Sequence, residues 1–416
     1  MKIKLQDGTM KFITDGIREV CEKYKRRAPG SQSERDAQVF FKKLLAKFSD
    51  EVISEDFTLH PHAFMGFIPI AATLLLIAMV LLRFGTSVVT SVFAAVLPVL
   101  CLLMFLFEFM MYKSFVDFLF PKRVSTNVYA VRKASGETKR RIIFGGHTDA
   151  SPEWTYSLHG QIKTIAPVMA GAIISMFVNL GINIYFLINV LKTGAPIEFE
   201  GVFKVLWIIE LCFVPFIIAI YFFINWRVIV DGANDNLSAN YIALSVIKEM
   251  AEQDLRFENT DVCCLISGSE EAGLRGARAF ARKHRKELLD TETVFIAMDT
   301  MREVEQLMVY TRGCTGTVKD SKAVGELIRE AGRNVGIEMP TAGLYPGAID
   351  AEAFSREGIK AAGFCGVNHD PKTYYHTRKD SWDNISPECI ELSLKICLEA
   401  ASLYDEKGGI ASYEKK

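Results

Sequence analysis

The sequence predicts an α/β protein: a mixed, mostly parallel sheet sandwiched by helices, with two transmembrane α-hairpins inserted into it. Three observations of the 416-residue chain lead to this prediction. Short, wholly apolar runs alternate with amphipathic helical patterns, as expected of parallel strands buried on both faces. Four longer runs are nearly free of charge, and each is about as long as a bilayer-crossing helix. The remaining polar sequence suffices for one large domain.

The polar N-terminal part contains two predicted helices. Residues 12–26 and 33–48 carry apolar side chains at every third or fourth position, and the turn sequence RRAPGS separates them. The predicted strands are short β-rich runs at 125–131, 140–146, 261–267, 293–298 and 360–365. Helical patterns lie between the later strands, at 237–253, 274–288 and 318–335. This alternation predicts a sheet with helices on both faces.

The charge-poor runs predict two transmembrane hairpins. The first pairs about 64–83 with 90–111, and the second pairs about 165–191 with 205–226. A soluble core helix would alternate apolar with polar positions, and these runs do not. The expected domain organisation is one domain made of 1–58, 121–160 and 228–416, with hairpin 1 at 59–120 and hairpin 2 at 161–227.

Two acidic residues lie near the ends of apolar runs. Glu108 belongs to the second run and Glu210 to the fourth. An ionisable residue inside a span is a functional candidate by default. The alternative is that both carboxylates lie at the membrane interface and are solvated there.

The flanks of the runs predict the orientation. Residues 1–56 are polar, so we expect no signal peptide. Lys and Arg residues are fewer at the hairpin tips (83, 192 and 204) than on the opposite flanks (113, 122, 123, 163 and 227). By the positive-inside rule the polar domain is expected in the cytoplasm. The nine scattered cysteines, without a CxxC pair, fit reduced thiols in that compartment.

Charge and composition exclude several classes of protein. The net charge is −1, from 48 basic and 49 acidic residues, so there is no electrostatic footprint for nucleic acid. The content of large apolar residues excludes a disordered or collagen-like chain.

Histidine and carboxylate side chains, which are common metal ligands, follow the predicted strands or precede a predicted helix. These segments are His147-Thr148-Asp149, Gly232-Ala233-Asn234-Asp235-Asn236, Glu270-Glu271, Asp299 and Tyr374-Tyr375-His376-Thr377. Taken singly, each has an ordinary structural explanation, such as a helix cap for the Asn-Asp-Asn sequence. Together they supply the nitrogen and oxygen ligands that suit zinc, at one end of one sheet. Metal-assisted hydrolysis also needs an acidic residue beside the metals that is not itself a ligand.

The motifs HTD, GANDN, SEEAGLRGARAF, MDT and YYHT, in this order, resemble the co-catalytic di-zinc aminopeptidase family, which includes bacterial leucyl aminopeptidases and glutamate carboxypeptidase. RRAPGS resembles the N-terminal segment of that family, and GAIDAEAFSREGIKAAG resembles its segment before the last strand. The resemblance covers all three polar pieces and implies a zinc exopeptidase-like fold. The inserted hairpins would make the chain a membrane-embedded variant.

The resemblance implies a role for each motif residue and two Zn²⁺ ions, or Co²⁺ or Mn²⁺ in their place. One zinc would be bound by His147 and Asp299, the other by Glu271 and His376, with Asp235 bridging both. Glu270 would be the general base, and Asp149 would hold His147 in the correct tautomer.

Two further residues belong to this expected site. Asp380 matches a family acid that supports the His376 end of the site. Tyr375 is either a hydrogen-bond donor to the developing oxyanion or a packing aromatic.

The function implied is an aminopeptidase, a membrane-anchored exopeptidase that hydrolyses N-terminal residues of peptides. Its expected partners are a peptide substrate and the lipid bilayer, and the oligomeric state stays open. A single-zinc, glutaminyl-cyclase-like enzyme and a non-catalytic receptor or transport component remain alternatives. Because hairpin 2 joins the HTD and GANDN segments, we expect the site near the membrane surface.

Overall fold

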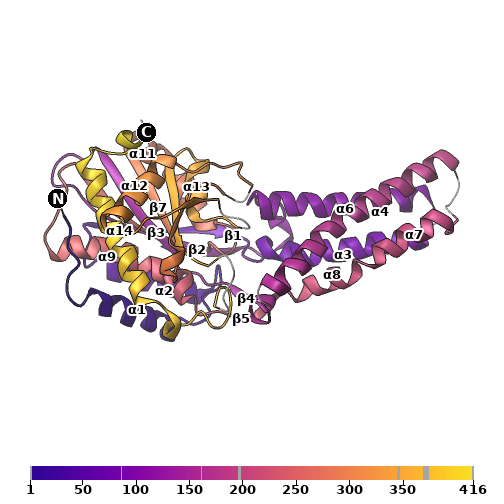
Figure 1. Cartoon of the computed structure of the whole chain (residues 1–416), viewed down its shortest axis with the longest axis horizontal. Coiled ribbons are helices and arrows are strands. Elements are labelled where there is room, and N and C mark those ends of the chain that lie inside the picture. The colour runs from indigo at the N-terminus through magenta and orange to yellow at the C-terminus, as the bar shows by residue number, and fades with distance from the viewer. Residues whose placement is uncertain are drawn as a thin grey trace. The chain divides into compact units, whose positions relative to one another are not determined.

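Three separate segments of the chain build one sheet in the computed structural model (Figure 1). The strand order is β1 (Glu51–Leu59), β2 (Arg123–Arg132), β6 (Thr260–Ser267), β3 (Arg140–His147), β7 (Glu292–Met301), β10 (Lys360–Gly366), β8 (Met308–Tyr310) and β9 (Thr341–Ala342). Neighbours from β6 through β3 and β7 to β10 are parallel. Antiparallel pairs are β1–β2, β2–β6 and β10–β8. The predicted mixed, mostly parallel sheet is therefore confirmed.

The structure describes residues 2–85, 87–160, 162–194, 198–313, 315–343, 347–368 and 374–414. The chain divides into two compact units. We term Met1–Pro61, Lys122–Glu153 and Arg227–Lys416 the sheet unit, and His62–Pro121 with Trp154–Trp226 the helical unit.

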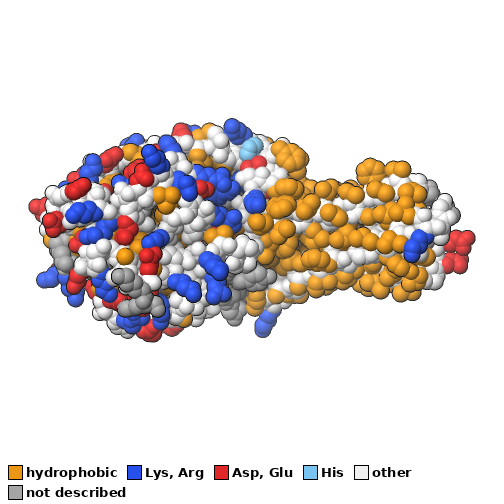
Figure 2. Space-filling model, turned by 90° about the horizontal axis from the view of Figure 1, so that it is seen from above, with side chains coloured by type: hydrophobic (Ala, Val, Ile, Leu, Met, Phe, Trp, Pro, Cys, Tyr) orange, Lys and Arg blue, Asp and Glu red, His pale blue; other side chains and the backbone are white. Residues whose placement is uncertain are grey.

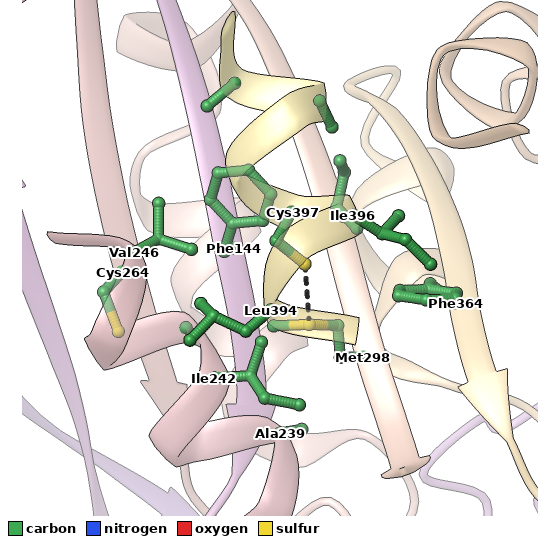
Figure 3. Close-up of a cluster of buried hydrophobic side chains, with 14 of the residues drawn as sticks. Phe144, Ala239, Ile242, Val246, Cys264, Met298, Phe364, Leu394, Ile396 and Cys397 are labelled. Carbon is green, nitrogen blue, oxygen red and sulfur yellow. Dashed lines mark hydrogen bonds between the residues drawn. The ribbon is translucent and has the colours of Figure 1, made fainter. Parts of the chain in front are cut away.

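One face of the sheet is covered by α1 (Thr9–Lys23), α2 (Gln32–Leu45), α9 (Ser238–Glu252), α12 (Lys322–Asn334) and α14 (Pro387–Glu406), whose apolar side chains belong to one buried cluster. Alternate residues of the central strands, such as Phe144 and Met298, point to this face. Figure 3 shows Ile242 of α9 and Leu394 of α14 meeting them. The thiol of Cys397 lies 3.4 Å from the sulfur of Met298. Side chains of α9 and α14 thus pack directly on the central strands β3 and β7.

The other face packs against α10 (Arg275–Lys283) and α13 (Asp350–Arg356). Aromatic rings make this contact. Phe354 lies 4.1 Å from Phe295 of β7 and 6.1 Å from Phe280 of α10, centroid to centroid, and Phe280 lies 5.0 Å from Tyr129 of β2. The central strands are therefore buried on both faces, as their unbroken apolar sequence predicts.

Some elements differ from the sequence prediction. The predicted helix 274–288 is two helices, α10 and α11 (Arg285–Asp290), that meet at His284. Strand β1 was not predicted, because its sequence EVISEDFTL mixes charged and apolar residues without regular alternation; it pairs with β2 along its whole length. The short strands β8 and β9, the last two at one end of the sheet, were missed as well. The short helices α5 (Thr155–Leu158) and α15 (Ala411–Glu414) complete the described helices.

The helical unit contains α3 (Ala63–Phe84), α4 (Val88–Met104) continued by a π-helical turn to Met110, α6 (Ile162–Thr193), α7 (Gly201–Leu211) and α8 (Val214–Ala219). Four helical stretches in it are long and apolar enough to cross a membrane, counting α7, α8 and the following turn as one. Hydrophobic side chains cover the visible surface of these helices (Figure 2). The fourth stretch is interrupted before Pro215, a residue favoured in the first turn of a new helix.

The end of the last predicted span is a strand. Residues 224–226, placed in the fourth run by the sequence, begin β5 (Ile224–Ile229), which pairs with β4 (Pro152–Trp154). This segment alternates polar with apolar side chains after Ile224, which is a strand pattern.

The two acidic residues of the apolar helices, Glu108 and Glu210, are buried inside the helical unit, which contradicts their solvation at an interface. Glu108 Oε2 accepts the backbone N–H groups of Phe115 (2.8 Å) and Val116 (3.1 Å), in the turn that follows the π-helix. Glu210 Oε1 accepts the side-chain amide of Asn183 at 3.4 Å. Both carboxylates are thus held inside the helical unit by hydrogen-bond donors.

Candidate metal centre

The sheet topology gathers the candidate ligands at one edge. His147 is the last residue of β3, and Asp299 lies near the end of β7. Glu270 and Glu271 follow β6, which ends at Ser267. Because β6, β3 and β7 are parallel neighbours, their carboxyl ends meet, which is where open α/β sheets bind ligands.

Two ligand groups share one carboxylate. His147, Asp235 and Asp299 form one group, and Asp235, Glu271 and His376 form the other. Oδ1 of Asp235 lies 3.1 Å from Nε2 of His147, while its Oδ2 lies 3.0 Å from Nε2 of His376. The same His376 nitrogen is 3.1 Å from Oε1 of Glu271. Asp235 therefore turns one oxygen toward each group, as a ligand bridging two ions does.

Several buried polar atoms of this site lack hydrogen bonds and are suited to bind a metal ion. His147 Nε2, Asp235 Oδ1 and Glu271 Oε1 are buried, and although each lies 3.1 Å from a partner atom, none makes a hydrogen bond of acceptable geometry within the described residues. Imidazole nitrogen and carboxylate oxygen are the donor set of catalytic zinc. The five residues of the two ligand groups thus fit zinc ions, which they would hold with Asp235 shared between the groups.

Burial shapes the protonation of the site. It raises the pKa of Glu270 well above its usual value, and it raises the pKa of Asp299 to about 8. Burial alone would lower the pKa of His376, but the carboxylates of Glu271 and Asp235 raise it to about 10. So many carboxylates in one buried site favour the entry of cations.

Asp149 holds two parts of the site together. Its Oδ1 accepts the backbone N–H of Glu270 at 2.9 Å, and its Oδ2 accepts that of Glu271 at 3.0 Å. Its backbone oxygen lies 3.2 Å from Nδ1 of His147. A proton on Nδ1 would leave Nε2 free as a ligand atom. Sequence reasoning expected only the contact with His147 and missed the two backbone contacts.

Asp380 holds the backbone of the loop that carries the bridging ligand Asp235. Its carboxylate accepts the backbone N–H groups of Asn234 (2.7 Å) and Asp235 (3.1 Å). The peptide bond between Asp235 and Asn236 is cis. The loop that carries the bridging carboxylate is thus fixed from a residue far along the chain.

Three positioning residues were missed by sequence reasoning. The amide of Asn236 donates to Met298 O (2.9 Å) and accepts from Thr300 N (3.3 Å), on either side of Asp299. Asn240 donates to the backbone oxygen of His147 at 2.7 Å. Asp350 accepts the hydroxyl of Ser267 at 2.5 Å. Asn236 lies in the GANDN motif and Asp350 in the GAIDAEAFSREGIKAAG segment, but neither sequence indicates which group the side chain contacts.

Tyr375 stacks on a proposed ligand. Its ring lies 4.1 Å from that of His376, centroid to centroid, with 15° between the planes. This contact gives Tyr375 a packing role on the imidazole.

Comparisons with known proteins agree with this geometry. Residues 222–401 match the family profile Peptidase family M28. No curated protein sequence matches the chain. Among solved structures, the zinc aminopeptidase BSAP from Bacillus subtilis is 13% identical, with a TM-score of 0.55 over 98% of this chain and 96% of that chain.

Two other solved structures are similar in fold. A Zn-dependent exopeptidase from Parabacteroides distasonis ATCC 8503 is 11% identical, with a TM-score of 0.55 over 95% of this chain and 98% of that chain. A glutaminyl cyclase from Fimbriiglobus ruber is also 11% identical, with a TM-score of 0.56 over 95% of this chain and 96% of that chain.

The sheet, its flanking helices and the ligand groups at the strand ends, together with the family match, define a zinc-dependent hydrolase of the peptidase class. Residues 222–401, a little under half of the chain, are similar to peptidase family M28.

Proposed function

We propose that this protein is a membrane-anchored exopeptidase with two zinc ions, which removes N-terminal residues from peptides. The observation that carries the proposal is the pair of ligand groups that share Asp235. His147 and Asp299 would hold one ion, and Glu271 and His376 the other. The names of the similar structures, zinc aminopeptidase and Zn-dependent exopeptidase, support exopeptidase chemistry.

When bound, the zinc ions would supply an acidified water and a polarised scissile carbonyl. Glu270 belongs to neither ligand group, yet its Oε2 lies 3.8 Å from Nε2 of His147. Its carboxylate is therefore placed to accept a proton from the attacking water and to deliver it to the leaving amine. The hydrogen bonds from Glu270 N and Glu271 N to Asp149 keep the base and its neighbouring ligand in register.

A glutaminyl-cyclase-like enzyme is the second candidate, because glutaminyl cyclases have the same fold. The two reactions differ in their products. An aminopeptidase releases a free amino acid from an aminoacyl substrate. A cyclase releases ammonia from an N-terminal glutamine, so assays of both products on the same preparation separate the candidates.

The deciding experiment measures metal content by mass spectrometry on detergent-purified protein, beside Asp235→Ala and the exposed control Asp254→Ala. We expect about two zinc ions per chain in the wild type and the control, and loss of both in Asp235→Ala. About one ion in the wild type would favour the cyclase. None, under conditions that do not strip metal, would contradict an enzymatic role and favour a receptor or transport component.

We also propose that the four apolar helices span a membrane as two hairpins, with the sheet unit in the cytoplasm. The excess of Lys and Arg on that side supports this orientation. Glu200 lies between α6 and α7, and the exposed Asp36 lies in the sheet unit. A membrane-impermeant maleimide applied to intact cells should label Glu200→Cys and spare Asp36→Cys; the reverse pattern would invert the topology.

A further inference from the structure

The segment from Arg27 to Glu34, which includes most of the RRAPGS turn, contacts three of the loops that carry the metal centre. Arg27 is completely buried. Its guanidinium donates to the backbone oxygens of Thr148 (Nε, 2.9 Å) and Asp231 (Nη2, 2.5 Å). Its Nη1 donates to Tyr24 O at the end of α1, at 3.2 Å. One side chain thereby joins the loop of His147 to the loop of Asp235.

The contact between these loops is tight. The backbone oxygen of Arg27 accepts the N–H of Ala150 at 2.9 Å, so the segment grips the first loop by main chain and side chain. Gly232 adopts φ 62°, and a Cβ there would lie 2.7 Å from Asp235 O and 3.1 Å from Arg27 Nη2. A larger residue would push the second loop off the guanidinium.

Glu34 holds the loop of Glu270 and Glu271 by hydrogen bonds. It is also completely buried, and its Oε1 accepts both the backbone N–H (2.6 Å) and the hydroxyl (2.9 Å) of Ser269. Its Oε2 accepts Gly30 N at 2.7 Å. Ser269 immediately precedes Glu270 and has φ 55°, a conformation that non-glycine residues rarely adopt. The hydrogen bonds from Glu34 therefore hold a strained residue directly before the base.

Neither of these buried side chains forms an ion pair with an oppositely charged side chain within the described residues, and a buried polar group is unfavourable unless it is hydrogen-bonded. Their hydrogen bonds go mainly to the ligand loops, from Arg27 to Thr148 O and Asp231 O and from Ser269 to Glu34. A guanidinium suits this purpose because its planar fork donates in several fixed directions at once, which an ammonium on a flexible stem does not.

We propose that Arg27 and Glu34 form a clamp that sets the separation of the ligand loops, and that Arg27 is a positioning residue for zinc binding. The inference rests on the proposed metal centre and goes beyond it. A carboxylate that bridges two ions tolerates only small displacements of its loop relative to the other ligands. Loss of the clamp should therefore weaken metal binding even in a chain that still folds.

The test compares Arg27→Lys with Arg26→Lys, a matched control at the neighbouring, exposed position. The stepwise zinc affinities of metal-depleted protein are measured by competition with a chromophoric chelator, and folding is checked by gel filtration and circular dichroism. We expect zinc affinity to fall about 10–100-fold in Arg27→Lys and to stay unchanged in the control. The rise in Tm on adding zinc should shrink in the same variant.

A purely structural role gives a different result. It lowers the Tm of the metal-free protein while the folded fraction binds zinc as the wild type does, and that outcome overturns the proposal. Where Arg27→Lys does not fold, Glu34→Gln serves as the second variant, with the exposed Glu22→Gln as its control. Glutamine keeps a single acceptor oxygen, so zinc affinity should again fall; unchanged affinity in a folded Glu34→Gln would overturn the clamp. A wild type that binds no zinc would contradict the proposed function instead.

Discussion

The carboxylate of Asp149 accepts the backbone N–H of Glu270 at 2.9 Å, and its second oxygen accepts the next N–H along the chain at 3.0 Å. Asp149 is completely buried and lies two residues after His147. One side chain thus ties a histidine at the end of β3 to the glutamate pair after β6. The distance between a metal ligand and the proposed base is set by this link, rather than by either loop alone.

This link predicts the effect of Asp149→Asn. The amide would turn a donor toward one of the two N–H groups, so one hydrogen bond would become a repulsive contact. We expect about a 10–100-fold loss in zinc affinity or in kcat/KM. Steady-state kinetics and zinc titration would measure it, with Asp254→Asn as the exposed control. Wild-type values for both quantities would show that the link is dispensable.

Glu270→Gln separates catalysis from metal binding. Glu270 belongs to neither ligand group, so the variant should keep its zinc content. Removal of a general base lowers kcat by about 10²–10⁴-fold. The measurement is kcat and metal content on the same preparation. A variant that keeps its activity would refute the assignment of Glu270 as the base, and one that loses zinc would make it a ligand.

The central part of the fold could be predicted from the sequence because β3, β6 and β7 are apolar on both faces. Such runs need helices on both sides, and the structure has them. Strand β1 could not be predicted in this way. It carries Glu51 and Glu55 on an edge, and only its pairing with β2, more than 60 residues away in the chain, makes it a strand.

The candidate site shows the same division. Sequence motifs singled out the residues that the structure brings into two ligand groups, because their chemistry is visible in one-dimensional order. The contacts of Asn236 and Asn240 were not visible, since their partners are backbone oxygens of Met298 and His147. A backbone oxygen has no sequence signature. The residues that hold a loop by its main chain are therefore found only once the fold is known.

Asp50 predicts a pH-dependent contribution to stability outside the site. Its two oxygens accept Arg256 Nη1 (2.6 Å) and Nη2 (2.7 Å), and these hydrogen bonds lower its pKa to about 2. Because the pKa is lower in the folded than in the unfolded chain, the stabilisation is present above about pH 4 and is lost as the pH falls toward 2. The pair is partly exposed, so about 1 kcal/mol is expected after allowance for solvent screening.

The measurement is thermal unfolding of wild type and Asp50→Asn in detergent across that pH range. The Tm of Asp50→Asn should be lower by a few degrees at pH 6, and the difference should vanish near pH 2. A difference that does not change with pH would mean that Asp50 acts through packing, not through its charge.

Glu108 and Glu210 should respond oppositely to the same substitution. Glu108 satisfies the buried N–H groups of Phe115 and Val116, so Glu108→Leu would leave two donors without an acceptor. Each such donor costs about 1–3 kcal/mol. Within the described residues, Glu210 receives a single, long hydrogen bond from Asn183, whose amide also donates to Asn179 Oδ1 at 2.9 Å. Replacing a buried, poorly satisfied carboxyl by an apolar side chain is often neutral or stabilising.

We therefore expect Glu108→Leu to lower the Tm of the detergent-solubilised protein, and Glu210→Leu to leave it unchanged or raise it. Both glutamates are equally buried in the helical unit, so each variant is the control for the other. A lower Tm in both variants would mean that Glu210 stabilises α6 against α7 more than its hydrogen-bond geometry indicates. The sign of the Tm change in Glu210→Leu thus decides whether the Glu210 carboxyl stabilises or destabilises the helical unit.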